Sequence, residues 1–266
     1  MYQEKILDQF YTKPEIAEFC YRILEKKYDL EDCFLIEPSA GSGSFSDLFH
    51  SNSIAIDLEP KKEYIKKEDF FKFKIKNNLK LNKIFTIGNP PFGKKSSLAL
   101  KFINKSAKYS DVIAFILPKS FKKTSIKNRI DLNIHLSYEI NLPKNSFIYK
   151  DQEYDVPCVF QIWEKKKEKR DIIKERRTTD LFDFTKKETA DFAIRRVGRL
   201  SGKVIIDFKL YNESNHYYIK SNIDKNKLLS TFYNSYLELN NIASNTAAIP
   251  SLSKGELIKI IEDNNI

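Results

Sequence analysis

Cys33-Phe34-Leu35-Ile36-Glu37-Pro38-Ser39-Ala40-Gly41-Ser42-Gly43-Ser44-Phe45 is the stretch that decides the fold. Its first four residues form an apolar run typical of a short buried strand, and a helical pattern follows over residues 46–50. Glycine permits tight backbone conformations and close approach of a ligand. A strand, a glycine turn and a helix are the first unit of a nucleotide-binding α/β fold, although two glycines alone also suit a plain turn.

The glycine loop favours one kind of ligand. It lacks the third glycine of a dinucleotide-binding loop, and no Gly-Lys-Ser/Thr of a P-loop follows. A nucleoside without a pyrophosphate suits it better. The next apolar run, Ser53–Ile56, predicts a second strand that leads to Asp57, where a carboxylate would accept hydrogen bonds from a ribose diol. Further on, Asp69 and Phe70 are placed to recognise an adenine amino group and pack its ring.

Asn89-Pro90-Pro91-Phe92 carries the second chemical signal. It ends the apolar run Lys83–Gly88, which predicts a buried strand, and two prolines force the backbone to turn there. The Asn89 amide and the Pro90 carbonyl can both accept hydrogens of an exocyclic amino group, while Phe92 can stack on a flat ring. A strand-ending turn with a buried Phe is the other interpretation of this tetrapeptide.

In this order the motifs resemble S-adenosylmethionine-dependent amino-methyltransferases, specifically the N6-adenine DNA methyltransferases of the gamma arrangement. Asp8–Glu15 resembles the extra cofactor motif that precedes the first strand in that group. The resemblance covers about residues 8–165. It implies an α/β fold with a Rossmann-like class I methyltransferase sheet, S-adenosylmethionine as cofactor, and sequence-specific methylation of the N6 amino group of adenine in DNA, as in restriction-modification.

The resemblance also implies roles for individual residues. The cofactor would be held by Tyr11, Thr12, Glu37, Ser39, Gly41, Gly43, Asp57, Asp69 and Phe70. The target base would be held by Asn89, Pro90, Pro91 and Phe92, with Phe147 as a second stacking aromatic. Phe92 replaces the more frequent Tyr of this family, which keeps the stacking surface and removes a hydroxyl.

Composition limits the partners. The net charge is +10 and 31% of residues are charged, so the chain attracts polyanions, although a Lys-rich composition alone is a weak signal. We expect Lys119, Arg195, Arg196 and Arg199 to contact a nucleic-acid backbone, since arginine pairs bidentately with phosphate.

Other classes of protein are disfavoured. The longest apolar run, Val112–Leu117, is too short to cross a bilayer, and the N-terminus has no secretory pattern. Three scattered cysteines have no metal-ligand spacing and indicate free thiols in a reducing compartment. We therefore expect a cytoplasmic protein without membrane or metal.

A charged run over residues 164–177 suggests two domains, a catalytic domain over 1–165 and a basic target-recognition lobe of α+β type over 166–266. Leu136–Ile140 and Val156–Trp163 should pair as antiparallel strands around a polar loop at 149–155. Capping boxes are expected at Thr12–Glu15 and Ser253–Glu256.

The sequence leaves alternative functions to be weighed. The same chemistry could act on adenine in RNA, and related turns serve glutamine methylation of release factors. The chain could instead be a non-catalytic nucleic-acid-binding subunit of a larger complex, which the full set of motifs disfavours. A nicotinamide dehydrogenase is disfavoured by the missing third glycine.

Overall fold

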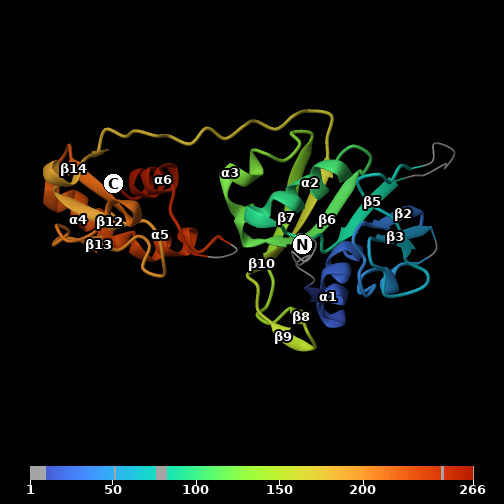
Figure 1. Ribbon diagram of the computed structural model, residues 1–266. Helices are drawn as coiled ribbons and strands as arrows, with labels where there is room; N and C mark the ends of the chain where they lie inside the picture. The colour runs from blue at the N-terminus through green and yellow to red at the C-terminus, as the bar shows by residue number, and fades with distance from the viewer. Residues whose placement is uncertain (1–9, 51, 76–82, 247–248, 266) are drawn as a thin grey trace. The chain divides into compact units, whose positions relative to one another are not determined.

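The computed structural model describes residues 10–50, 52–75, 83–246 and 249–265. It divides into two units, Met1–Ile172 and Ile173–Ile266 (Figure 1). The division lies a few residues after the end of the last strand of the first unit, because Arg170 is tied back to that unit. Its backbone N–H donates to the Leu132 carbonyl over 2.9 Å, and its guanidinium donates to the carbonyl of Ile130 over 2.8 Å. Asp8 and Gln9 of the N-terminal motif lie outside the described residues.

Seven strands form the central sheet of the first unit, in the order β4-β3-β2-β5-β6-β10-β7. Their bounds are β2 Cys33–Glu37, β3 Ser53–Asp57, β4 Lys66–Lys67, β5 Lys83–Gly88, β6 Val112–Pro118, β7 Ile134–Asn141 and β10 Cys158–Lys165. The strands from β4 to β6 are parallel, whereas β10 is antiparallel to both β6 and β7. The predicted Rossmann-like α/β sheet and the antiparallel pair near its end are confirmed.

The pattern of side chains along β6 explains why the sheet is covered on both faces. All seven of its residues are buried. Alternate residues beginning at Val112 join the core cluster that contains α1 (Pro14–Glu25), and the residues between them, beginning at Ile113, join the cluster that contains α2 (Ser97–Ser106). A strand buried on both faces is apolar without interruption, as this one is.

The chain after β2 differs from the expectation. The helix predicted over residues 46–50 is only a short 3-10 helix, Ser46–Leu48. The Glu37 carboxylate accepts the Ser46 N–H over 2.8 Å, and the backbone is already extended at Phe49. Because β3 begins at Ser53, too few residues remain for an α-helix to form.

A small second sheet, in the order β1-β8-β9, replaces the polar loop expected at 149–155. It consists of β1 (Tyr11–Thr12), β8 (Phe147–Tyr149) and β9 (Gln152–Tyr154). This sheet also shows that the predicted capping box at Thr12–Glu15 does not form. Thr12 pairs with Phe147 in this sheet, so α1 begins at Pro14 with Lys13 at the N-cap and no side-chain cap.

The second unit is an α+β lobe with its own core. Its antiparallel sheet has the order β11-β14-β12-β13, and three helices pack on it. The bounds are β11 Phe182–Phe184, β12 Phe192–Arg195, β13 Val204–Ile205, β14 His216–Ser221, α4 Lys225–Asn234, α5 Tyr236–Ala243 and α6 Lys254–Asn264. The capping box at Ser253 and Glu256 is confirmed at the start of α6.

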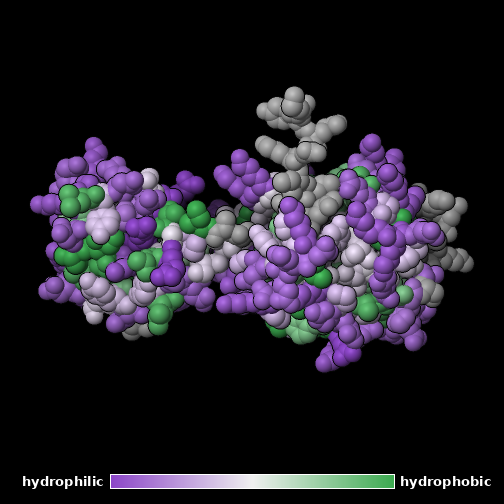
Figure 2. All heavy atoms as spheres, turned by 60° about the horizontal axis from the view of Figure 1, so that its bottom comes forward, coloured by the Kyte–Doolittle hydropathy of each residue, from purple (hydrophilic) through white to green (hydrophobic). Residues whose placement is uncertain are grey.

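Apolar side chains also reach the surface of this second unit. Figure 2 shows hydrophobic residues gathered on one face of it, and Leu210 and Leu237 are 95% and 79% exposed. In neither unit does the described chain contain a helix of the length and hydrophobicity that a membrane crossing requires.

Candidate functional site

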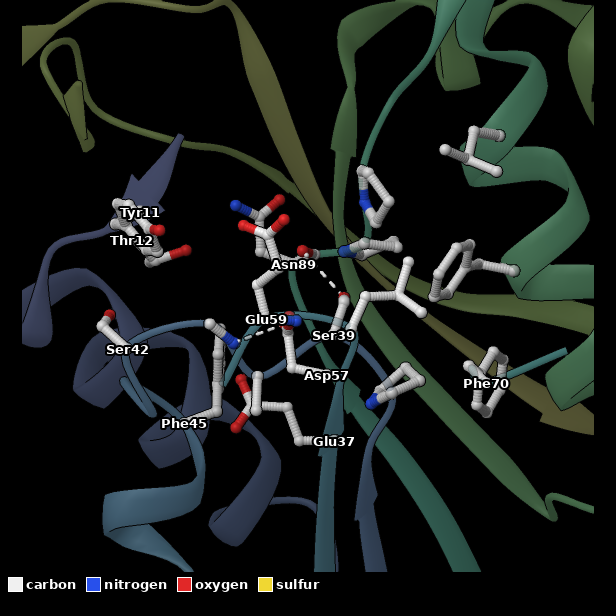
Figure 3. A pocket seen from close by; sticks show the side chains of 18 of the residues that line it. Tyr11, Thr12, Glu37, Ser39, Ser42, Phe45, Asp57, Glu59, Phe70 and Asn89 are labelled. Carbon is white, nitrogen blue, oxygen red and sulfur yellow. Dashed lines mark hydrogen bonds between the residues drawn. The ribbon is translucent and has the colours of Figure 1, made fainter. Parts of the chain in front are cut away.

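A cavity lies where strands β2, β3 and β5 end at the same edge of the sheet. Parallel strands bring their carboxyl ends together, and ligands of open α/β sheets bind at that edge. It is lined by Phe10, Tyr11, Thr12, Glu37, Pro38, Ser39, Ala40, Gly41, Ser42, Ser44, Phe45, Asp57, Leu58, Glu59, Glu68, Asp69, Phe70, Phe71, Asn89, Pro90, Pro91, Phe92, Leu98 and Phe102. Figure 3 shows the polar side chains near Asn89 and Asp57, with Tyr11 and Phe70 on opposite sides of them.

Most of the predicted site residues therefore meet in one place. Twelve of them line the cavity, namely Tyr11, Thr12, Glu37, Ser39, Gly41, Asp57, Asp69, Phe70, Asn89, Pro90, Pro91 and Phe92. They come from β1, β2 and β3 and from the segments that follow β2, β4 and β5. Gly43, Phe147, Lys119 and the three arginines of the second unit do not line it.

The glycine loop closes one side of the cavity. Gly41 has φ +52°, and a Cβ at this position would lie 3.0 Å from Cε1 of Tyr11. Gly43 has φ +84°, and a Cβ there would lie 2.4 Å from the Tyr64 hydroxyl. Both positions therefore need glycine, but Gly43 shapes the turn through its N–H bond to the Ala40 carbonyl rather than facing the cavity.

Asp57 joins two loops at the cavity wall. Its Oδ2 accepts the Gly41 N–H over 2.7 Å, and its Oδ1 accepts the Glu59 N–H over 2.7 Å. A carboxylate has about four lone-pair positions, so two such bonds leave acceptor capacity for hydroxyl groups of a ligand. Glu59 and Glu68 add carboxylates to the same wall. Sequence reasoning gave neither a site role, and the signal was weak because isolated acids are usually solvated.

Glu37 is a buried carboxyl at the floor of the site. It is 2% exposed, and burial raises its pKa to about 8, against the opposing effect of hydrogen bonds from Ser46. Its Oε2 accepts the Ser46 N–H over 2.8 Å, which holds the glycine loop onto the end of β2. Near neutral pH this carboxyl is therefore largely protonated.

Aromatic rings form the apolar end of the cavity. Phe70 and Phe102 are stacked, with ring centroids 5.1 Å apart, and Phe71 meets Phe102 edge-on at 5.0 Å. The Asp69 carboxylate accepts the Phe71 N–H over 2.9 Å, which fixes the turn that carries these rings. Phe71 and Phe102 were not predicted as site residues. Phe102 sits in an amphipathic helix, where an aromatic residue normally indicates only core packing.

The amide of Asn89 is held in one orientation. Its Nδ2 donates to the Phe10 carbonyl over 3.2 Å, so its Oδ1 faces the other way. That oxygen is buried and has no hydrogen-bond partner among the residues that the structure describes. The Asn89 carbonyl accepts from Ser39 Oγ over 3.2 Å, and the neighbouring Pro90 has no N–H to donate. The turn therefore places these acceptors beside the cavity that Asn89, Pro90 and Phe92 line.

The structure corrects the prediction that Phe147 stacks on a target base. Its side chain is fully buried in the core cluster around α1, and its backbone pairs with Thr12 in the small sheet. A ring enclosed in this way has no free face for a base. Two other aromatic residues lie at or next to the cavity: Phe10 lines it, and the ring of Tyr154 stacks on that of Phe10 with centroids 4.9 Å apart.

The residues predicted to contact a nucleic-acid backbone are not among those that line the cavity. Lys119 begins a 3-10 helix, Lys119–Lys122, directly after β6. In the second unit, Arg195 Nε donates to the Val197 carbonyl over 2.9 Å, and the Arg196 guanidinium lies 5.0 Å from the centre of the Tyr217 ring. Arg199 is exposed.

No family model and no curated protein sequence matches the chain. Among solved structures, the chain is similar to a candidate RNA methyltransferase from Pyrococcus horikoshii, with 17% identity and a TM-score of 0.49 over 60% of this chain and 88% of that one. A modification subunit of a candidate type I restriction enzyme from Vibrio vulnificus has 15% identity and a TM-score of 0.44, over 59% of this chain and 44% of that one.

A candidate class I S-adenosylmethionine-dependent methyltransferase from Listeria monocytogenes has 16% identity and a TM-score of 0.44, over 62% of this chain and 64% of that one. The fold assignment of the first unit rests on its own strand order and pairing, which make it an α/β unit with a Rossmann-like sheet.

Proposed function

We propose that the first unit binds S-adenosylmethionine in the cavity and transfers its methyl group to the N6 amino group of an adenine in DNA. The observation that carries the proposal is that the side-chain oxygen of Asn89 is buried and has no hydrogen-bond partner among the described residues. An amide oxygen that is buried without a partner costs free energy, so its persistence beside a cavity indicates a ligand that donates a hydrogen bond. The Nδ2 bond to Phe10 leaves this oxygen as the free end of the side chain.

The other cavity residues fit the proposed cofactor. Gly41 lets the ring of Tyr11 pack closely against the glycine loop, because a Cβ at Gly41 would lie 3.0 Å from Tyr11 Cε1. Asp57, Glu59 and Glu68 offer acceptors for the two ribose hydroxyls, and Asp69 with the rings of Phe70 and Phe71 suits an adenine. When bound, S-adenosylmethionine would supply an electrophilic methyl group on a positively charged sulfur.

The chain's own groups would orient the acceptor amine. Asn89 Oδ1 and the Pro90 carbonyl would each accept one N6 hydrogen, which favours a pyramidal nitrogen and directs its lone pair at the methyl carbon. Phe92 would pack on the face of the base. The N–C bond would form as the C–S bond breaks, and the proton released from nitrogen would pass to solvent. Catalysis of this kind depends on positioning and fixed dipoles.

The choice of substrate is tested by transfer of labelled methyl groups from S-adenosylmethionine to unmethylated duplex DNA and, separately, to total RNA. The product nucleosides are resolved by mass spectrometry. We expect N6-methyladenine in DNA. Label confined to RNA would overturn the DNA assignment while keeping the chemistry, and no label in either, with cofactor binding intact, would overturn the proposed nucleic-acid methyltransfer.

A further inference from the structure

A short lysine-rich loop adjoins the catalytic turn. Gly93–Ser97 follows Phe92 directly, and the N–H groups of Leu98 and Ala99 both donate to the Phe92 carbonyl, over 3.1 and 3.2 Å. Phe92 and Leu98 line the cavity, so the loop between them, with Lys94 and Lys95, is closed at the cavity rim. Both lysines are exposed.

The backbone of this loop is held in an uncommon conformation. Lys95 has φ +53° and Ser96 has φ +61°, both in the left-handed region that residues other than glycine seldom occupy. Such a conformation costs roughly 1 kcal/mol or more per residue and concentrates at ligand-binding sites. The surroundings enforce it, because buried Ser96 and Ser120 are joined through their hydroxyls at 2.7 Å.

That hydroxyl contact ties the loop to the segment after β6, which is also rich in lysine. Residues 93–97 and 118–127 together contain six lysines and no Asp or Glu. Lys122 and Lys127 are near Glu139 on β7, at 3.5 and 3.7 Å, and are thus partly neutralised. By contrast, Lys94, Lys95 and Lys119 show no side-chain hydrogen bond or ion pair within the described part of the chain.

We propose that Lys94 and Lys95, supported by Lys119, hold the phosphates that flank the target nucleotide of a nucleic-acid substrate. The inference rests on the proposed function, since it assigns the polyanion that the same site would act on. Unpaired lysines at the rim attract phosphate, and the fixed loop keeps them beside the turn that would hold the base. A lysine ammonium is a point charge, so this surface positions the strand and carries no base specificity.

The test compares two double variants of the full chain that remove the same charge. Lys94→Gln with Lys95→Gln changes the proposed surface. Lys83→Gln with Lys108→Gln changes exposed lysines at the first residue of β5 and shortly before β6, at the opposite edge of the sheet. Binding of a fluorescent duplex and a single-stranded oligonucleotide is measured by anisotropy at several salt concentrations. S-adenosylmethionine affinity is measured separately by calorimetry.

Each phosphate contact contributes about 0.9 to the salt slope for duplex DNA and about 0.7 for a single strand. We therefore expect the Lys94/Lys95 variant to bind roughly tenfold more weakly near physiological salt, with a slope shallower by about 1.8 or 1.4, respectively. Cofactor affinity should not change in either variant. A salt slope equal to that of the Lys83/Lys108 variant would overturn the proposal.

The two proposals can fail separately. If the wild-type chain transfers no methyl group but the Lys94/Lys95 variant still loses affinity and salt slope, the phosphate surface stands and the methyltransfer does not. If methyl transfer occurs and the salt slopes of the two double variants coincide, the proposed methyltransfer stands and the phosphate surface does not.

Discussion

At the scale of single residues, the site depends on a few polar contacts that fix otherwise mobile groups. Asp57 joins the glycine loop to the segment after β3, Glu37 holds Ser46, and Phe10 orients Asn89. Glu37, Asp57 and Asn89 could be predicted as candidate site residues from the sequence, because each stands at the end of an apolar run and carries a polar side chain. Their orientation could not, since it is set by partners far along the chain, such as Phe10 for Asn89.

Glu37 gives a prediction about pH. Its pKa is about 8 in the folded protein and near 4.5 when exposed, so the folded state binds the extra proton. Its contribution therefore lowers stability as pH rises from about 4.5 to about 8, and is constant outside that window. Glu37→Gln cannot ionise and can still accept the Ser46 N–H. The decrease in unfolding free energy between mildly acidic and mildly basic pH should be smaller in this variant, by roughly 1–3 kcal/mol.

Urea unfolding of wild type and variant across that pH window measures the difference. An identical pH profile for the two proteins would show that Glu37 ionises normally in the folded state.

At the scale of elements, the central strands of the large sheet were predictable and the small sheet was not. Strands β2, β3, β5 and β6 are apolar runs ended by an acid, glycine or proline, which is a strong local signal. The β8–β9 hairpin has only three residues in each strand, and its turn uses Lys150 and Asp151 at φ +49° and +60° instead of glycine or asparagine. It is stabilised by Phe10 and the two tyrosines Tyr149 and Tyr154, which are distant from one another in sequence or hidden among polar residues.

This hairpin is expected to support catalysis through Phe10. The rings of Tyr154 and Phe10 are nearly parallel, at 5° and 4.9 Å, and the Phe10 carbonyl holds the Asn89 amide. Tyr154→Ala should cost about 1 kcal/mol of stability, as expected for a partly exposed aromatic pair, and lower kcat several-fold with little change in cofactor affinity. Tyr154→Phe keeps the ring and is the matched control.

Methyl-transfer kinetics and cofactor calorimetry on the two Tyr154 variants separate these effects. If Tyr154→Phe lowers kcat as much as Tyr154→Ala does, then the Tyr154 hydroxyl and not its stacked ring supports catalysis.

At the scale of the whole molecule, the motifs along the chain predicted a Rossmann-like sheet. The parallel strands each end at the same edge, so motifs that follow them in sequence meet in one cavity. The second unit was predictable only as an α+β lobe. Its strands are short, and a segment such as β11, Phe182–Phe184, is too brief to give a periodic signal.

The two units should also behave independently towards protease. Each has its own core, and residues 171–178, which span the boundary after Ile172, are exposed and lack regular structure. Within the described part of the chain, brief trypsin treatment should cleave first after Lys174 or Arg177. Mass spectrometry of the fragments identifies the sites. First cleavage inside the strands or helices of either unit would contradict this division.

The most direct test of the central claim is the rate of N6-methyladenine formation by Asn89→Ala, with S-adenosylmethionine affinity measured on the same preparation. Removing the amide should reduce kcat by roughly 10²-fold or more, because a fixed polar group at the reacting amine is lost. Cofactor binding should persist, since the cofactor's proposed contacts come from other residues. Wild-type methyl transfer by Asn89→Ala would contradict the account.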